Sequence, residues 1–207
     1  DRKNISVWGG VCSIATGTNP YQMVTVGTYA YAANMGSDNV SVIDTATNTV
    51  IDTISIWDGP YGLTYNSTSK ELYIANTFSD NVSVIDLDPA NTGTYHTVTH
   101  TINVGIQPYY ATSLGGNVYV TNNISNTVSV IDTTTHAVTA TVGVWTAPRG
   151  IRAHGTDLYV ANYGSGSYGT APTSNGTVSV INSLTNTVTD TITVWVWPRW
   201  VAVLGDE

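Results

Sequence analysis

Short runs rich in Val, Ile, Thr and Tyr recur along the chain, with apolar and polar positions alternating and Gly, Asn, Asp, Ser or Pro between the runs. Alternation with a period of two is typical of half-buried β-strands, and the separating residues are typical of tight turns. No stretch shows the apolar spacing of an amphipathic helix. The pattern therefore predicts an all-β protein.

The runs belong to an internal repeat. Val-Ser-Val-Ile followed by Asp or Asn occurs at residues 40–44, 82–86, 128–132 and 178–182, and Ile5-Ser-Val-Trp8 resembles a degenerate fifth copy. A Tyr-X-X-Asn segment precedes each of the four good copies, at 31–34, 73–76, 119–122 and 159–162. A proline turn opens each unit, at 19–21, 59–61, 107–109, 147–149 and 197–199.

Four short strands in a unit of about 40–45 residues are the signature of a propeller blade. The prediction is a single domain, 1–207: one five-bladed β-propeller of four-stranded blades, with repeats near 19–57, 58–105, 106–145 and 146–195. The fifth blade is expected from 196–207 plus 1–18, so that the N- and C-terminal strands share one blade and close the ring. The expected innermost strands are 21–26, 61–66, 109–114, 149–154 and 199–204; second strands, 29–34, 71–76, 117–122 and 157–162; outer strands, 50–56, 98–104, 138–144, 188–194 and 11–16.

The fifth blade lacks a clear second strand, and three explanations stay open. The blade is shortened, or the chain is a piece of a longer protein, or a strand from a neighbouring molecule fills the place by strand addition. The third explanation would make other copies of this chain, or surface proteins, its partners.

Tyr119-Val-Thr-Asn122 and the stretch 126–132, Asn-Thr-Val-Ser-Val-Ile-Asp, resemble the YVTN-type β-propeller repeat family. The resemblance covers residues 19 to 204. It implies the fold firmly and the function loosely, because such repeats occur in surface-layer-like proteins, in periplasmic proteins and in a few enzymes, including lyases that work at the channel face.

Composition narrows the function. Hydrophobic residues make up 42% of the chain and charged residues 10%, against about 25% in a typical soluble protein. With six basic residues and a net charge of −8, we expect neither nucleic-acid binding nor membrane docking or insertion. The single cysteine, Cys12, excludes an internal disulfide. Asn-X-Ser/Thr sequons favour an exported glycoprotein, and they occur at Asn4, Asn39, Asn66, Asn81, Asn123 and Asn175.

The proline turns should gather aromatic and basic side chains on one face, around the mouth of the central channel. Such side chains suit sugar rings, aromatic ligands or protein partners, although the tryptophans also suit packing between blades. The candidate binding residues are Trp57, Tyr61, Tyr109, Trp145, Arg149, Trp195, Trp197 and Arg199.

No catalytic motif is evident, and no cofactor is predicted. Asp44, Asp86 and Asp132 are expected to form turns rather than a calcium site. His96 and His100 straddle a predicted strand and His136 and His154 look isolated, so no metal site is predicted. The leading hypothesis is an extracellular, non-enzymatic structural and adhesion module of the cell surface, a filament or a surface layer. The alternative is a lectin-like propeller that binds glycans, and an enzyme such as a channel-face lyase is the weakest hypothesis.

Overall fold

The computed structural model describes residues 13–164, 175–195 and 197–202. These residues form 16 strands in four antiparallel sheets, each of four strands joined in sequence order. The predicted all-β class is confirmed. Within the described ranges, no helix has the length and apolar character needed to cross a bilayer.

Each sheet is one blade. The first blade contains β1 (Pro20–Val26), β2 (Tyr29–Asn34), β3 (Asn39–Asp44) and β4 (Thr49–Ser55). The second contains β5 (Pro60–Asn66), β6 (Glu71–Asn76), β7 (Asn81–Asp86) and β8 (Val98–Asn103). The third contains β9 (Pro108–Leu114), β10 (Asn117–Asn122), β11 (Thr127–Asp132) and β12 (Ala137–Gly143). The fourth contains β13 (Pro148–His154), β14 (Asp157–Asn162), β15 (Thr177–Asn182) and β16 (Thr187–Thr193).

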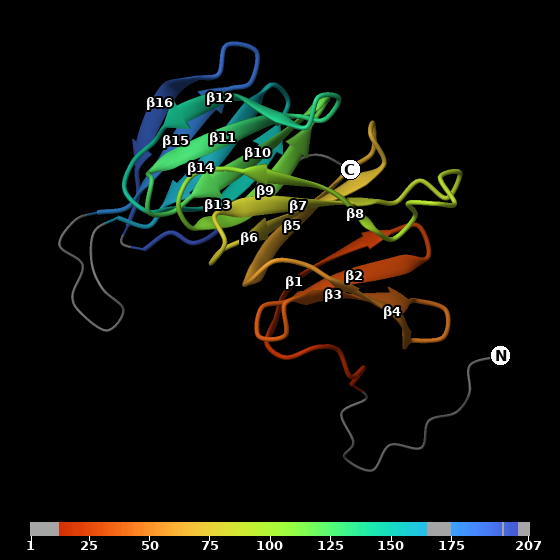
Figure 1. Cartoon of the computed structure of the whole chain (residues 1–207). Coiled ribbons are helices and arrows are strands. Elements are labelled where there is room, and N and C mark those ends of the chain that lie inside the picture. The colour runs from red at the N-terminus through yellow and green to blue at the C-terminus, as the bar shows by residue number, and fades with distance from the viewer. Residues whose placement is uncertain (1–12, 165–174, 196, 203–207) are drawn as a thin grey trace.

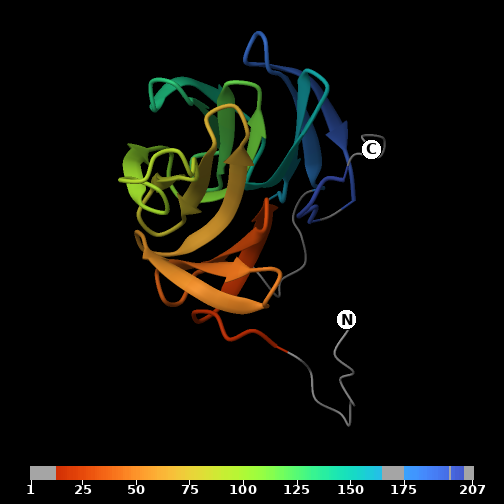
Figure 2. The ribbon, with the colours of Figure 1, turned by 90° about the vertical axis from the view of Figure 1, so that its right-hand side faces the viewer.

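The blades follow one another around a common axis (Figures 1 and 2). β1 lies beside β5, β5 beside β9, and β9 beside β13, so the first strand of every blade is the innermost. In Figure 2 the orange-red first blade and the blue fourth blade are the two ends of this series. The arrangement is that of a β-propeller.

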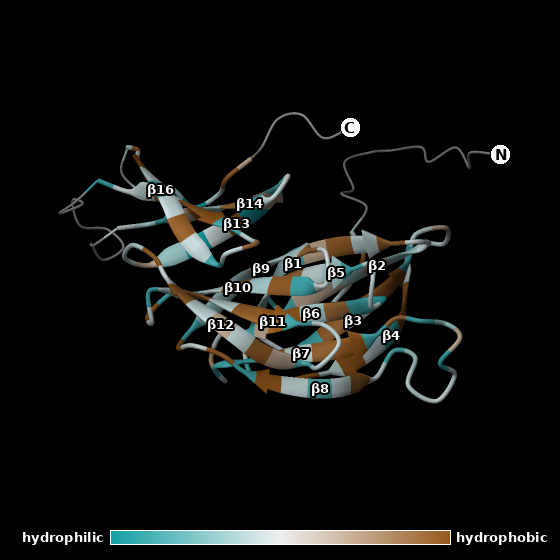
Figure 3. Cartoon of the chain, turned by 90° about the horizontal axis from the view of Figure 1, so that it is seen from above, coloured by the Kyte–Doolittle hydropathy of each residue, from teal (hydrophilic) through white to brown (hydrophobic). Residues whose placement is uncertain are grey.

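The main cores lie between neighbouring blades, where the faces of adjacent sheets meet. Each core receives a tyrosine from the second strand of one blade and aliphatic residues from the next blade. These tyrosines are almost fully buried: Tyr31 (1% exposed), Tyr73 (0%) and Tyr119 (1%). Figure 3 shows that the strands carry most of the hydrophobic residues while the turns are largely pale or hydrophilic.

The repeated Asn and Ser side chains hydrogen-bond to each other within each blade, and we call this contact the Asn–Ser bracket. In the third blade, Asn122 ends β10 and its Nδ2 donates to Ser129 Oγ (2.9 Å) and Thr127 Oγ1 (3.0 Å) on β11. Asn34, Asn76 and Asn162 donate to Ser41, Ser83 and Ser179 in the same way. All four asparagines are fully buried, and the bracket gives their amide N–H groups partners in the core, while Oδ1 of each accepts no hydrogen bond from the described residues.

The predicted blade number differs from the four sheets observed. Residues 5–8, expected to form a third strand of the fifth blade, lie outside the described residues, as do 203 and 204. Residues 13–16 and 199–202 are described and form no strand. Residue Gly150 of β13 nevertheless donates its N–H to Arg199 O (3.0 Å), which places the end of the described chain beside the innermost strand of the fourth blade.

Candidate functional site

Every inner strand begins with a proline turn followed by a β-bulge. The residue before each proline has a positive φ: Asn19 (52°), Gly59 (72°), Gln107 (60°), Ala147 (55°) and Trp197 (62°). Just after the proline, the register of β1, β5, β9 and β13 shifts against the second strand. Bulges re-aim side chains. The residues after the prolines, which we call the Tyr–Arg row, are Tyr21, Tyr61, Tyr109, Arg149 and Arg199.

Members of the Tyr–Arg row contact one another from blade to blade. The ring centroids of Tyr21 and Tyr61 are 4.2 Å apart, and those of Tyr61 and Tyr109 are 4.9 Å apart. The Arg149 guanidinium lies 5.3 Å from the Tyr109 centroid and 4.2 Å from the centroid of Tyr163, a residue just after β14. The row is therefore a continuous aromatic and cationic surface.

The C-terminal segment extends the row through Tyr163. The Arg199 guanidinium lies 5.8 Å from the Tyr163 centroid, and the Trp197 ring stacks on Tyr163 at 5.8 Å with 5° between the planes. Sequence analysis missed Tyr163, because it stands in no repeated motif. Of the predicted binding residues, Tyr61, Tyr109, Arg149, Trp197 and Arg199 are brought together here.

A second aromatic layer supports the row. Tyr110 packs edge-on against Tyr61 at 5.2 Å, and Trp200 packs on Tyr110 at 4.4 Å. Burial, reinforced by the neighbouring phenol of Tyr110, raises the pKa of Tyr61. The Tyr61 phenol therefore stays protonated at neutral pH, and its hydroxyl group can both donate and accept hydrogen bonds.

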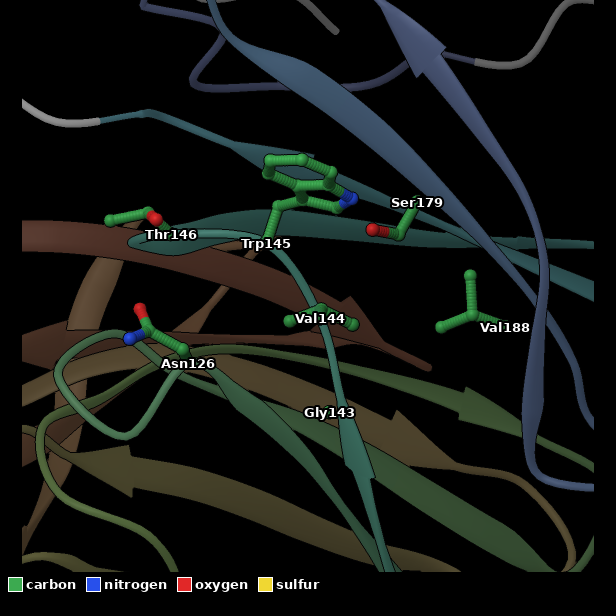
Figure 4. Close-up of a pocket in the computed structure, with 7 residues that line it drawn as sticks. All are labelled: Asn126, Gly143, Val144, Trp145, Thr146, Ser179 and Val188. Carbon is green, nitrogen blue, oxygen red and sulfur yellow. The ribbon is translucent and has the colours of Figure 1, made fainter. Parts of the chain in front are cut away.

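The tryptophans after the outer strands occupy a different place. Trp57 Nε1 donates to Thr101 Oγ1 (3.1 Å) on β8, the outer strand of the following blade. Trp145 borders a pocket of about 480 Å³ between the third and fourth blades, whose wall includes Ser179 and Val188 (Figure 4). Trp195, on the fourth blade, is 91% exposed. Contact with the next blade is thus observed for Trp57, and Trp145 lines a pocket together with residues of the next blade.

Side-chain oxygens beside the proline turns accept hydrogen bonds from backbone N–H groups of the turns. Asp38 Oδ1 accepts the Gly59 N–H (3.0 Å), and Asp80 Oδ1 accepts the Gln107 N–H (2.8 Å). Asn126 repeats the contact in the next blade. The expected turn-forming role of the third-strand acids is confirmed, since Oδ1 of each accepts nearby backbone N–H groups in Asp44, Asp86 and Asp132.

The sequons divide by burial. Asn175 is exposed and Asn39 and Asn123 are half-buried, whereas Asn4 lies outside the described residues. Asn66 is fully buried and donates to Ser113 Oγ and Gly115 O, and Asn81 is 6% exposed and accepts from Asn76. A sugar on Asn66 or Asn81 would have to displace packed neighbours in the folded chain, so Asn39, Asn123 and Asn175 are the more accessible of the described sequons.

Histidines lie at two blade junctions, and the prediction that His136 is isolated is wrong. His136 Nε2 lies 2.8 Å from Glu71 Oε1 of the second blade, and its ring stacks on His100 at 3.7 Å. His96 Nε2 bonds the Tyr31 hydroxyl of the first blade (2.9 Å). Burial lowers the pKa of His96, and Asp52, 3.8 Å away, partly opposes the shift.

No protein-family model matches the sequence, and no curated protein matches it. Solved structures do share the fold. Hydrazine synthase of Kuenenia stuttgartiensis has a TM-score of 0.74 at 21% identity, with 91% of this chain and 53% of that chain covered. The dihydro-heme d1 dehydrogenase NirN has a TM-score of 0.67 at 10% identity, with 88% of this chain and 39% of that chain covered. The Pan2 WD40 domain of Neurospora crassa has a TM-score of 0.67 at 14% identity, with 87% of this chain and 54% of that chain covered.

The chain thus spans about half or less of the length of these three structures. Two of them are named as enzymes and one as a WD40 domain, and at these identities the likeness concerns the fold alone. The chain is a β-propeller.

Proposed function

We propose that this chain is an extracellular, non-enzymatic adhesion module of a cell surface, surface layer or filament, and that the Tyr–Arg row is its recognition surface. The single observation that carries the proposal is the unbroken contact from Tyr21 through Tyr61 and Tyr109 to Arg149. Tyr and Arg are residue types that anchor protein interfaces, since they combine large contact area with directed polar groups.

The carboxylates near the row favour recognition over catalysis. Asp38 and Asp80 are engaged as acceptors for backbone N–H groups, which is a structural use of an acid. A hydrolase or lyase needs an acid or base aimed at a substrate. The low charged fraction of 10% is consistent with an exported β protein rather than a cytosolic enzyme.

The test is binding of the purified chain to whole cells and isolated envelope fractions. Tyr61→Ala and Arg149→Ala should each reduce binding by about tenfold or more, the loss expected at an interface anchor. Leu184→Ala is the matched control, because Leu184 is 79% exposed and remote in sequence from every proline turn. Unchanged binding by both row variants would refute the role assigned to the row.

Glycan binding is the second candidate, and the pocket beside Trp145 favours it. An indole edge with hydroxyl and amide groups nearby, here from Thr146, Ser179 and Asn126, suits the apolar face and hydroxyls of a sugar ring. A glycan-array signal that disappears in Trp57→Ala and Trp145→Ala, and persists in Tyr61→Ala, would support it.

We also propose that the ring has five blades and that the chain belongs to the YVTN-type repeat family. Support comes from Trp197, whose φ of 62° matches the residue before each of the other four prolines, and from the bond between Gly150 and Arg199. Slow amide hydrogen exchange at 199–202 would agree with strand pairing there. Fast exchange in monomers, with protection in oligomers, would instead favour strand addition from another copy.

A further inference from the structure

We propose that Glu71, His100 and His136 form a binding site for a divalent transition-metal ion of the Zn²⁺ class, at the junction of the second and third blades. One ligand atom from each side chain lies within 4.8 Å of the others. Two imidazoles and one carboxylate are a donor set that zinc sites use, with a fourth position left for water.

The strand register places the first two ligands on one face of the second blade. Tyr73 of β6 pairs with Val84 of β7, which pairs with His100 of β8, and Glu71 is two residues before Tyr73 on β6. Because side chains alternate along strands, Glu71 and His100 point to the same side as Tyr73. That side faces the third blade, since Tyr73 packs there with Val118 and Val120.

The third ligand comes from the turn between β11 and β12. His136 has a φ of 52°, and its backbone N–H donates to Asp132 O (2.9 Å). Asp132 Oδ1 also accepts the N–H groups of Thr134 and Thr135, so the turn is fixed by several bonds. The turn therefore holds His136 over the neighbouring blade, where it meets Glu71.

The carboxylate has a supporting contact of the kind that metal ligands use. Tyr73 O–H donates to Glu71 Oε2 (2.7 Å), which leaves Oε1 to face His136. The Glu71 and His136 side chains are 12% and 16% exposed, so both are held by their surroundings. Second-layer contacts like the one from Tyr73 orient a ligand and typically change metal affinity about 10–100-fold.

Metal binding requires a small rearrangement that the site permits. Tetrahedral zinc with bonds of about 2.0 Å places its ligand atoms roughly 3.3 Å apart. The rings of His100 and His136 are stacked with 9° between their planes, so their lone pairs must turn toward a common point. His100 is exposed on β8, so its ring can turn toward the ion by giving up the stack on His136 and the contact of Nδ1 with Thr99 Oγ1 (3.1 Å). The ion would then join the two blades.

The experiment is calorimetric titration of the full chain, freed of metal by a chelator, with ZnCl2. We expect one Zn²⁺ per chain and a rise in melting temperature with zinc, because an ion that binds only the folded chain stabilises it. His100→Asn and His136→Asn should each weaken binding at least about tenfold, as should Glu71→Gln. Tyr73→Phe should weaken it about tenfold.

His96→Asn is the matched control, because His96 also stands at a blade junction, yet it faces Tyr31 and Asp52 and should leave zinc affinity unchanged. Circular dichroism of each variant without zinc separates loss of a ligand from loss of the fold. Absence of binding by the folded wild-type chain, or wild-type zinc affinity in the His100→Asn and His136→Asn variants, would overturn the proposal.

Discussion

Tyr73 and Tyr159 stand at equivalent positions in the second and fourth blades, and their burial differs. Tyr73 is 0% exposed because the third blade covers it, whereas Tyr159 is half-buried. The same contrast separates Trp57, 55% exposed and bonded to the next blade, from Trp195, 91% exposed. The tyrosine of the second strand and the tryptophan after the outer strand are therefore covered by the following blade, whereas Asn162 is buried within the fourth blade itself.

The largest predicted difference concerns these tyrosines. Tyr73→Ala should destabilise the chain by about 3–5 kcal/mol, because it opens a cavity between two blades. Tyr159→Ala should cost as much if the proposed fifth blade covers Tyr159, and clearly less if the fourth blade is the last of the ring. Urea denaturation measures both. Equal losses would mean that a fifth blade covers Tyr159 in solution. A loss under about 1 kcal/mol for Tyr73→Ala would contradict the packing described between the second and third blades.

A smaller loss is expected from breaking one Asn–Ser bracket. Asn122→Ala removes two donated bonds from a fully buried side chain and deprives the buried Ser129 hydroxyl of its donor, which should destabilise by about 1–3 kcal/mol. Asn175→Ala, on the exposed surface, is the control and should change the free energy of unfolding by under about 0.5 kcal/mol. Equal free energies of unfolding for the two variants would show that the bracket does not contribute to stability.

The junction of the first and second blades should respond to mild acid through His96. Its folded-state pKa is lowered, mainly by burial, so near pH 6.5 the unfolded chain binds more protons than the folded chain. The contribution of His96 to stability is therefore complete above about pH 6.5 and decreases as the pH falls toward the folded-state pKa.

Unfolding free energies measured from pH 7.5 to 5 should show this decrease. In His96→Gln the pH dependence should be flatter, whereas His154→Gln should retain it. An unchanged slope in His96→Gln would assign the acid sensitivity to other groups.

The smallest effects concern the exposed tryptophans. Trp57→Ser loses the bond to Thr101 and the packing on β8, so we expect a loss of about 1 kcal/mol, against under about 0.5 kcal/mol for Trp195→Ser. Thermal melting compares the two. A larger loss for Trp195→Ser would indicate that something covers the outer edge of the fourth blade.

Most of the fold could be predicted because each blade repeats the same short sequence motifs. The second strands were predicted at the residues where β2, β6, β10 and β14 lie, and the outer strands of these four blades within one residue of their observed ends. The fifth predicted outer strand, 11–16, is not observed at residues 13–16. Prolines, tight turns and alternation act over a few residues, so the sequence reveals them directly. The blade number depends on contacts between chain ends, which no local pattern encodes.

The site was predictable in part for the same reason. The members of the Tyr–Arg row follow repeated prolines, so their shared location could be inferred from any one blade. The contact between His136 and Glu71 joins residues 65 positions apart on two blades, and neither residue belongs to a repeated motif. Finding it requires knowing which face of one blade meets which turn of the next.

The Asn–Ser bracket is kept although the repeat units differ in length. Successive Val-Ser-Val-Ile segments begin 42, 46 and 50 residues apart, yet the bracket recurs with nearly the same geometry. The extra residues of the second blade, 88–97, fall between β7 and β8, outside the bracketed pair of strands. Those of the fourth blade fall between β14 and β15, inside the pair, where the Asn162–Ser179 bond spans 17 residues instead of 7 and keeps its length of 2.9 Å. Loops between the strands of a blade can thus accept insertions or replacements while the paired strands keep their geometry.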